Sequence, residues 1–353
     1  MKLLYEDIRT LAPIFNPKCK YLYTIINYRL NMAKYLLKEQ DRKIISFLDG
    51  ESRISINKLA KRVHLSKDGV NYRLKKLFNE GIITRCFAEI NVAKLGLIIG
   101  KVALQFQNLD DKKADEIFEY LKKSTKIPWV VYCSGRWDCI FGLFVKDIYE
   151  TQEVLNNLSE RYGKHILSKE VLVEPEYYVV GRGWPTNPKN RIIAKIGGKV
   201  EDLADGLDKK IIEVLAKNCR TPIINIAVSL KQSAGTIINR IKNLEKKGII
   251  QNYFIGLNLD KIEMEFCKAF VYLQNPAKKE YGLLVDYCLK HPNVTAISKM
   301  VGAWEMEIEM EVKNFDEFYR IMNQIKSQFK EVVKSYEAVT ITREHGRDYS
   351  KFL

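Results

Sequence analysis

The chain has 353 residues, 46% of them hydrophobic, which is enough for two or three buried cores and argues against a disordered protein. Its formal net charge of +15 favours a phosphate-rich partner or an anionic membrane surface, and charge alone does not separate these two. No run approaches the roughly 20 apolar residues of a membrane span, and seven cysteines without a CxxC pair argue against zinc and against a disulfide framework. We therefore expect a cytoplasmic protein with free thiols, no metal, no cofactor and no membrane contact, although Cys133 and Cys139 flank a predicted turn and could pair.

Residues 1–37 form an extension that is rich in tyrosine and lysine. Its later part, YLYTIINYRLNMAKYLL, is compatible with a helix that runs into the next unit. Packing or oligomer contacts are the roles that this composition suggests.

Residues 38–92 have the pattern of a winged helix-turn-helix. Apolar residues recur at helical spacing in 44–48 and again in 59–63, which predicts two short helices. Ser66 then stands where its side-chain oxygen can cap a third helix, SKDGVNYRLKKLFNEG, which ends at Gly81. This helix has an apolar face at i, i+4 and i+7 and a polar N-terminal face, as in helices that enter the major groove. The apolar run that follows, GIITRCFAEIN, predicts a β-hairpin wing.

Residues 96–180 predict a small α/β sandwich. From Ile98 onward the order is strand, helix, strand, strand, helix, strand, with the helices at 112–124 and 148–162. This βαββαβ order is ferredoxin-like, with one antiparallel sheet and two helices on one of its faces.

The whole pattern occurs twice at a constant offset of 167 residues, which is the spacing from Asp41 to Asp208. The same offset, without gaps, aligns Ser66 with Ser233. Copies of roughly 145 residues are domain duplications, because solenoid periods are about 20 to 50 residues. The remaining predicted segments are a Gly-, Pro- and Asn-rich linker at 181–204, a second winged helix-turn-helix at 205–259, a second ferredoxin-like domain at 263–345, and a tail at 346–353.

Each predicted sheet has one face that its own helices leave uncovered. Apolar strands on that face must be shielded from water. The other copy can supply the cover, so we expect an α+β fold in which the two sheets pack against each other as an intrachain pseudo-dimer.

Both copies resemble the Lrp/AsnC (feast/famine) regulators over nearly their whole length. The motifs that carry the resemblance are LAKRVHLSKDGVNYRLKKLFNEGIIT with IAVSLKQSAGTIINRIKNLEKKGIIQ, and SGRWDCIFGLFV with VGAWEMEIEMEV. The resemblance implies an archaeal or bacterial transcription regulator that binds double-stranded DNA in the nucleoid. It also implies ferredoxin-like effector domains of the RAM type that dimerise, an amino acid or related small molecule as effector, and the capacity for larger homo-oligomers.

Carried over by position, the resemblance implies DNA contacts from the N-terminal face of each third helix. The residues are Ser66, Lys67, Asp68, Asn71, Tyr72, Arg73, Lys75, Ser233, Ala234, Thr236, Asn239, Arg240 and Lys242. An asparagine there can read a base edge, whereas lysine and arginine neutralise phosphates. A salt bridge within the wing is the alternative role for the two arginines.

The Gly-x-aromatic-acidic hairpins match the part of the family near which the effector binds. The residues are Gly135, Trp137, Asp138, Gly302, Trp304 and Glu305. A buried core position is the alternative for the two tryptophans, and it is the commoner role for an aromatic residue. The glycines have a backbone reason, because a turn often requires positive φ.

The third helices of the two copies differ at the positions that would contact DNA, since KDGVNY in the first copy aligns with AGTIIN in the second. The sequence therefore predicts an asymmetric operator with unequal half-sites about one helical turn, or a multiple of it, apart.

Two other functions remain open from the sequence. Siroheme decarboxylases resemble the same tandem architecture and rely on histidines near an HPxVTHNY-like segment. This chain has HPNVTAIS from His291, with Ala296 where the motif histidine would fall, and KIPWVVYC in the first copy. General acid–base chemistry near neutral pH is usually assigned to histidine, so we expect no enzyme. The third alternative is a metabolite-sensing protein without DNA binding.

Overall fold

The computed structural model describes residues 34–353, so nearly all of the extension predicted at 1–37 lies outside the described residues. The helix trios are α3 (Glu39–Glu51), α4 (Ile56–Val63) and α5 (Lys67–Asn79), then α8 (Gly206–Lys217), α9 (Ile223–Ser229) and α10 (Ala234–Lys246). Ser66 and Ser233 both cap the third helix by accepting a backbone N–H at 3.0 Å. The preceding turns also match, because His64 and Lys231 both adopt left-handed conformations with φ of 55° and 54°. The two predicted helix-turn-helix units are confirmed.

The predicted hairpin wing within each copy is wrong. Each apolar run forms a single strand, β1 (Ile83–Ile90) or β7 (Ile250–Leu257), and these two strands pair with each other antiparallel, with Phe87 opposite Phe254. Neither run contains the two-residue Gly or Asn turn that a tight hairpin needs, so the hydrogen-bonding partner comes from the other copy. The contacts between the two copies continue beyond these strands, since the Cys219 N–H donates to the Cys86 carbonyl at 3.0 Å. The two helix trios therefore share one apolar core.

The predicted βαββαβ order is confirmed in both copies. Copy one comprises β2 (Ile98–Phe106), α6 (Asp111–Lys123), β3 (Trp129–Gly135), β4 (Cys139–Val145), α7 (Ile148–Tyr162) and β5 (Ile166–Val180). Copy two comprises β8 (Glu265–Leu273), α11 (Lys278–Lys290), β9 (Val294–Val301), β10 (Met306–Val312), α12 (Phe315–Gln328) and β11 (Val333–His345). Short 3-10 helices occur at Val92–Lys94, Gly163–His165, Asp260–Ile262 and Tyr349–Lys351.

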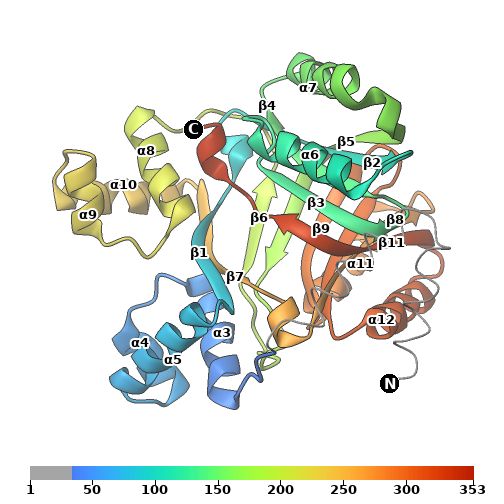
Figure 1. Ribbon diagram of the computed structural model, residues 1–353. Helices are drawn as coiled ribbons and strands as arrows, with labels where there is room; N and C mark the ends of the chain where they lie inside the picture. The colour runs from blue at the N-terminus through green and yellow to red at the C-terminus, as the bar shows by residue number, and fades with distance from the viewer. Residues whose placement is uncertain (1–33) are drawn as a thin grey trace.

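The two sheets join into one closed, barrel-like sheet with the helices outside (Figure 1). The edge strand β3 pairs with β11, and β9 pairs with β5, so both edges of each four-stranded sheet find a partner in the other copy. The inner faces also meet, as predicted, in a core that contains Val131, Leu172 and Phe270. Edge pairing adds to the predicted face-to-face contact because unpaired edges leave backbone N–H and C=O groups without hydrogen bonds.

The predicted linker is ordered and contains a further strand, β6 (Ile193–Gly197), which pairs with β5. Arg182 fastens its start to the body, because its guanidinium contacts Asp49 of α3 at 2.9 Å and Glu311 of β10 at 2.8 Å. The tail is also docked, since the Tyr349 hydroxyl lies 2.8 Å from a Glu89 carboxylate oxygen. The linker and the tail thus both hold the helix-turn-helix units and their wing strands against the closed sheet.

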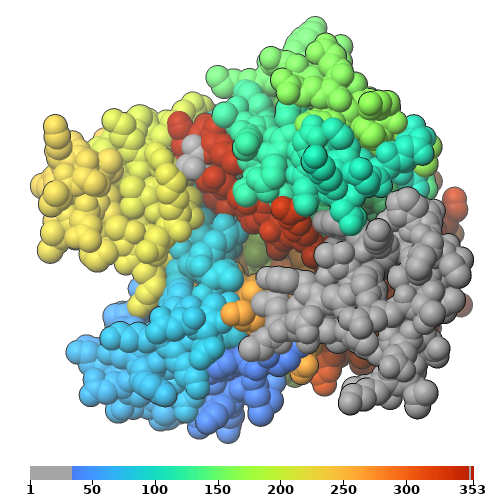
Figure 2. All heavy atoms as spheres, in the orientation of Figure 1, coloured from blue at the N-terminus to red at the C-terminus, as the bar shows by residue number. Residues whose placement is uncertain are grey.

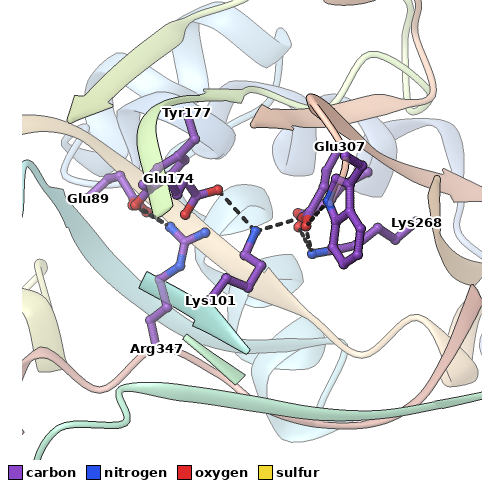
Figure 3. Close-up of polar contacts among 9 residues, drawn as sticks. Glu89, Lys101, Glu174, Tyr177, Lys268, Glu307 and Arg347 are labelled. Atoms are coloured by element: carbon purple, nitrogen blue, oxygen red, sulfur yellow. Dashed lines mark hydrogen bonds and ion pairs between the residues drawn. The ribbon is translucent and has the colours of Figure 1, made fainter. Parts of the chain in front are cut away.

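A chain of buried charges crosses the interior of the closed sheet (Figure 3). Glu307 accepts hydrogen bonds from Lys101 Nζ at 2.7 Å and from Lys268 Nζ at 2.9 Å. Lys101 also contacts Glu174 at 3.0 Å, and Lys268 contacts Glu309 at 2.8 Å. Because burial of an unpaired charge is costly, these lysines and carboxylates must be kept together.

Six cysteines lie in the described residues, and all are buried free thiols, which confirms the expectation for Cys133 and Cys139. Cys19 lies outside the described residues. Between residues 34 and 353, no helix combines the length and the apolar character needed to cross a membrane.

Candidate nucleic-acid interface and central cavity

The two helix trios protrude as separate lobes from one side of the molecule (Figure 2). In the first lobe, Val70, Leu74 and Leu77 are buried and hold α5 against its neighbours. The polar face of α5 is thereby turned outward: Ser66, Lys67, Asp68, Tyr72 and Lys75 are exposed, and Asn71 is half-buried. Because Ser66 caps the helix, its hydroxyl oxygen is already engaged.

Arg73 and Arg240 each form an ion pair with the first helix of their own unit. Arg73 Nη1 contacts Asp41 Oδ1 at 2.9 Å, and Arg240 Nη1 contacts Asp208 Oδ1 at 3.2 Å. Both carboxylates belong to the buried side of the first helix of the unit, so each arginine compensates a desolvated charge. The salt-bridge alternative for the two arginines is thus present in the structure, with the first helix rather than the wing as the partner, and their role at DNA stays a prediction.

Several exposed cations on α4 were not among the predicted contacts. Lys58, Lys61 and Arg62 are exposed on this helix, which directly precedes the recognition helix. In helix-turn-helix proteins the first of the two helices crosses the phosphate backbone. The run INKLAKRV carries three cations in eight residues, of which Arg62 is paired with Glu51 at 2.6 Å.

The second lobe presents a different surface. Ser233, Ala234, Asn239 and Lys242 are exposed, whereas Thr236 is half-buried. The Thr236 hydroxyl lies 2.9 Å from Ser233 Oγ, so both hydroxyls are engaged in the cap.

Apolar side chains replace polar ones on the outer face of this lobe. Ile224 and Val228 of α9 are 69% and 73% exposed, and Ile238 of α10 is 40% exposed. The equivalent positions in the first lobe are Asn57, Lys61 and Asn71. The second lobe therefore has fewer groups that could contact phosphates or base edges.

The Gly-x-aromatic-acidic hairpins contribute to the core of the closed sheet. Trp137 and Trp304 are buried, and their ring centroids are 6.1 Å apart. Asp138 and Glu305 accept the backbone N–H groups of Phe106 and Leu273 at 2.7 and 2.9 Å.

Backbone conformation explains the two glycines of these hairpins. Gly135 and Gly302 have φ of 138° and 153°. None of the six residues predicted to bind an effector lines the cavity described next. Core and turn positions were the alternative for these residues, and the effector role that the sequence assigned to them stays a prediction.

A cavity of about 660 Å³ lies at the opposite end of the closed sheet, beneath the paired wings. Its wall combines residues from β1 and β7, from the inner strands of both copies, and from the tail. Ile99, Phe144, Phe254, Met264 and Phe266 form an apolar part of this wall. Pockets of roughly 300 to 1,000 Å³ with an apolar wall and a few polar groups are typical of small-molecule sites.

Tyrosine and histidine side chains on the cavity wall are held in their neutral forms. Burial, with the nearby Glu89 carboxylate, raises the pKa of Tyr177 well above its ordinary value, although Arg347 opposes the shift. Burial lowers the pKa of His345, and the positive charges of Lys351 and Lys122 lower it further. At neutral pH these two groups therefore act as hydrogen-bonding partners rather than as charges.

Comparison with known proteins shows which family has similar sequences. A family profile described as winged helix-turn-helix DNA-binding matches residues 37–84 and 205–251. An uncharacterized HTH-type transcriptional regulator of Pyrococcus horikoshii is 31% identical over 123 residues, which are 35% of this chain and 82% of the relative. The chain belongs to the Lrp/AsnC family of transcriptional regulators. The HTH-type transcriptional regulator LysM of Saccharolobus solfataricus is 29% identical to this regulator over 123 residues, which cover 35% of this chain and 84% of LysM.

A solved structure covers both copies of this Lrp/AsnC regulator at once. The siroheme decarboxylase NirDL aligns over 88% of this chain and 93% of its own, with a TM-score of 0.58 and 14% sequence identity. At this identity the likeness concerns the fold alone. The tandem arrangement of two units in one closed body is thus shared with a protein that is named as an enzyme.

Proposed function

We propose that this DNA-binding regulator recognises an asymmetric operator, with the first lobe supplying most of the affinity. The observation that carries the proposal is the difference between two equivalent surfaces. Lys61 and Asn71 of the first lobe are replaced by Val228 and Ile238 in the second. Because neutralisation of phosphates supplies much of the affinity for DNA, the lobe with more exposed cations should bind more tightly.

We also propose that the regulator works in the cytoplasm on nucleoid DNA and responds to an amino acid or a related small molecule. The cavity beneath the wings supports a small-molecule effector site there, because its wall includes residues of both wing strands, and its volume favours the related small molecule over a free amino acid. Association of pseudo-dimers into larger homo-oligomers is part of the same proposal, and it follows from the family rather than from a described surface.

Footprinting of the full chain on its own promoter region is expected to show two unequal protected half-sites. Their centres should lie about 10 base pairs, or a multiple, apart, because both recognition helices must reach the major groove from one side of one body. The half-site bound by α5 should tolerate fewer base changes than the other. A perfect inverted repeat with equal sensitivity in both halves would contradict the proposal.

The enzyme alternative is favoured by the fold shared with NirDL and by the presence of a cavity. However, Ala296, the position where the decarboxylase-like motif would have histidine, lies on the cavity wall, and its equivalent in the first copy is Trp129. Of the four histidines of the chain, His345 alone lines the cavity. An imidazole that could exchange protons is thus missing from the two matching positions.

Siroheme incubated with the full chain under anaerobic conditions is therefore expected to keep all its carboxyl groups. Mass spectrometry of the extracted tetrapyrrole measures the loss of carbon dioxide directly. A decarboxylated product formed over many turnovers would establish the enzyme. NirDL, the siroheme decarboxylase, serves as the positive control in a parallel incubation.

A further inference from the structure

The strongest unassigned feature is an arginine on the cavity wall that lacks an acidic partner. Five cations line the cavity, namely Arg85, Lys101, Arg182, Arg343 and Arg347. Four of them contact carboxylates within ion-pair distance: Lys101 contacts Glu174 and Glu307, Arg182 contacts Asp49 and Glu311, Arg343 contacts Asp115 and Glu119, and Arg347 contacts Glu89. Within residues 34–353, Arg85 alone among the five has no such contact.

The Arg85 guanidinium is held in place by uncharged groups. Its Nη1 donates to the Arg347 carbonyl at 2.7 Å, and its Cζ lies 4.4 Å from the centre of the Phe87 ring. The opposite residue on β7 is Gly256, where a Cβ atom would come within 3.0 Å of Arg85 Cγ. The absence of a side chain at Gly256 thus leaves the space that the arginine occupies.

The nearby carboxylates do not neutralise this charge by contact. Glu344 is held instead by the Trp129 indole N–H at 3.0 Å, and Glu89 is shared by Arg347 and two tyrosine hydroxyls. Burial lowers the pKa of Arg85, although Glu344 and Glu89 oppose the shift. A partly buried guanidinium with most of its N–H donors unused is stabilised by an anion that accepts them.

We propose that the cavity binds a monocarboxylate with an apolar body larger than a single amino acid, with its carboxylate on Arg85. In the part of the chain that the structure describes, Arg85 has no carboxylate within ion-pair distance and donates one N–H to a carbonyl, so one carboxylate on the ligand can accept its remaining N–H groups. The volume of about 660 Å³ corresponds to roughly 20 water molecules, which exceeds the need of a free amino acid. The apolar wall accounts for the ligand body.

A second polar group on the wall is also unsatisfied. The Thr342 hydroxyl oxygen is buried, lines the cavity and has no hydrogen-bond partner in the described part of the chain. It lies on β11 of the closed sheet, whereas Arg85 lies on β1, so a ligand that contacted both residues would touch a wing strand and the closed sheet together. The ligand site itself does not depend on the proposed regulatory function. Only its expected consequence, a change in DNA affinity when the ligand binds, rests on that function.

Calorimetric titration of the full chain with indole-3-butyrate and with its neutral amide tests the assignment. The wild type is expected to bind the carboxylate more tightly than the amide. Arg85→Gln should weaken carboxylate binding by about tenfold or more, the size of a lost charge-assisted hydrogen bond, and should leave amide binding unchanged. Arg136→Gln is the matched control, because Arg136 is exposed at the other end of the closed sheet and does not line the cavity.

Equal affinities for the two probes, equal effects of the two arginine variants, or no binding of the carboxylate by the wild type would each overturn the proposal. Ala296→Phe, which fills the cavity, should abolish binding of both probes, and its failure to do so would place the probe elsewhere. Mobility shifts of promoter DNA with the same preparations separate the two claims. Probe binding without a DNA shift would refute the proposed function and leave the ligand site standing, whereas a DNA shift without probe binding would do the reverse.

Discussion

The Glu307→Gln variant is expected to lose about 3 kcal/mol of its free energy of unfolding. Breaking a buried ion pair by removing one partner typically costs about 3 to 5 kcal/mol. The lower end applies here because Lys101 and Lys268 each keep a second carboxylate, Glu174 and Glu309. Glutamine keeps one oxygen that can accept from Trp304 Nε1, as Glu307 Oε1 does at 3.1 Å, but its NH2 group then replaces the oxygen that accepts from the two lysines. Urea unfolding at pH 7 measures the difference.

The effect of Glu307→Gln should depend on pH in a defined direction. Burial by itself raises the pKa of Glu307, but Lys101 and Lys268 outweigh it and lower the pKa to about 2. A carboxyl group with a depressed pKa stabilises the fold above its unfolded pKa of about 4.5, and the contribution fades as the pH falls toward 2. The difference between wild type and variant should therefore be full at pH 7 and shrink below about pH 4.5.

Glu213→Gln is the control for this experiment. Glu213 forms an exposed pair with Lys217 at 2.7 Å on α8, and such pairs contribute about 0.5 kcal/mol or less. A loss below about 1 kcal/mol for Glu307→Gln, or a difference that did not change with pH, would show that the network does not stabilise the closed sheet through charge.

The double variant Lys67→Ala with Lys75→Ala is expected to weaken DNA binding by about ten- to a hundredfold near physiological salt. Both side chains are exposed on the outward face of α5. If each neutralises one phosphate, the slope of log affinity against log salt should become shallower by about two units. Fluorescence anisotropy with a labelled promoter duplex at several salt concentrations measures affinity and slope together.

Two controls separate local contacts from net charge. Lys278→Ala with Lys279→Ala removes two exposed positive charges from α11 and should leave the slope unchanged. Lys242→Ala tests the position on α10 equivalent to Lys75, and its effect should be smaller because the second lobe has fewer exposed cations around it. An unchanged slope for the α5 variant would remove these lysines from the phosphate contacts.

Local features of the fold could be predicted from the sequence because their causes lie within a few residues. Ser66 and Ser233 cap the helices that begin beside them, and the constant offset of 167 residues fixes the equivalence of the two copies. The order of strands and helices in each effector domain follows from the same local periodicities. The pairing of strands between the two copies does not follow from local periodicity.

The exchanged wings and the closed sheet depend on contacts between distant segments. An apolar run such as GIITRCFAEIN shows that a strand forms, but it does not show whether the partner strand follows directly or comes from the other copy. Likewise, the alternating glutamates of EMEIEMEV could be read as an ordinary strand until Lys101, 206 positions away, is found beside Glu307.

The arginine pairs are a case in which the sequence held a usable signal. Arg73 lies 32 residues after Asp41, and Arg240 lies 32 residues after Asp208. The same aspartate and the same arginine recur in both copies, as do the capping serine and the lysine at 75 and 242, whereas the remaining residues expected at DNA differ between the copies. An ion pair that both copies retain is more readily explained by the same structural role in each copy than by contact with the same DNA base in each half-site.

Fusion of the two copies also determines how occupancy of an operator varies with protein concentration. A regulator built from separate subunits dissociates on dilution. At low abundance, occupancy of its operator therefore rises with the square of the monomer concentration. Here the second lobe is tethered and docked beside the first at any concentration. Binding to one operator should therefore rise linearly with the amount of chain, and a substitution in one recognition helix alters one half-site without altering the other.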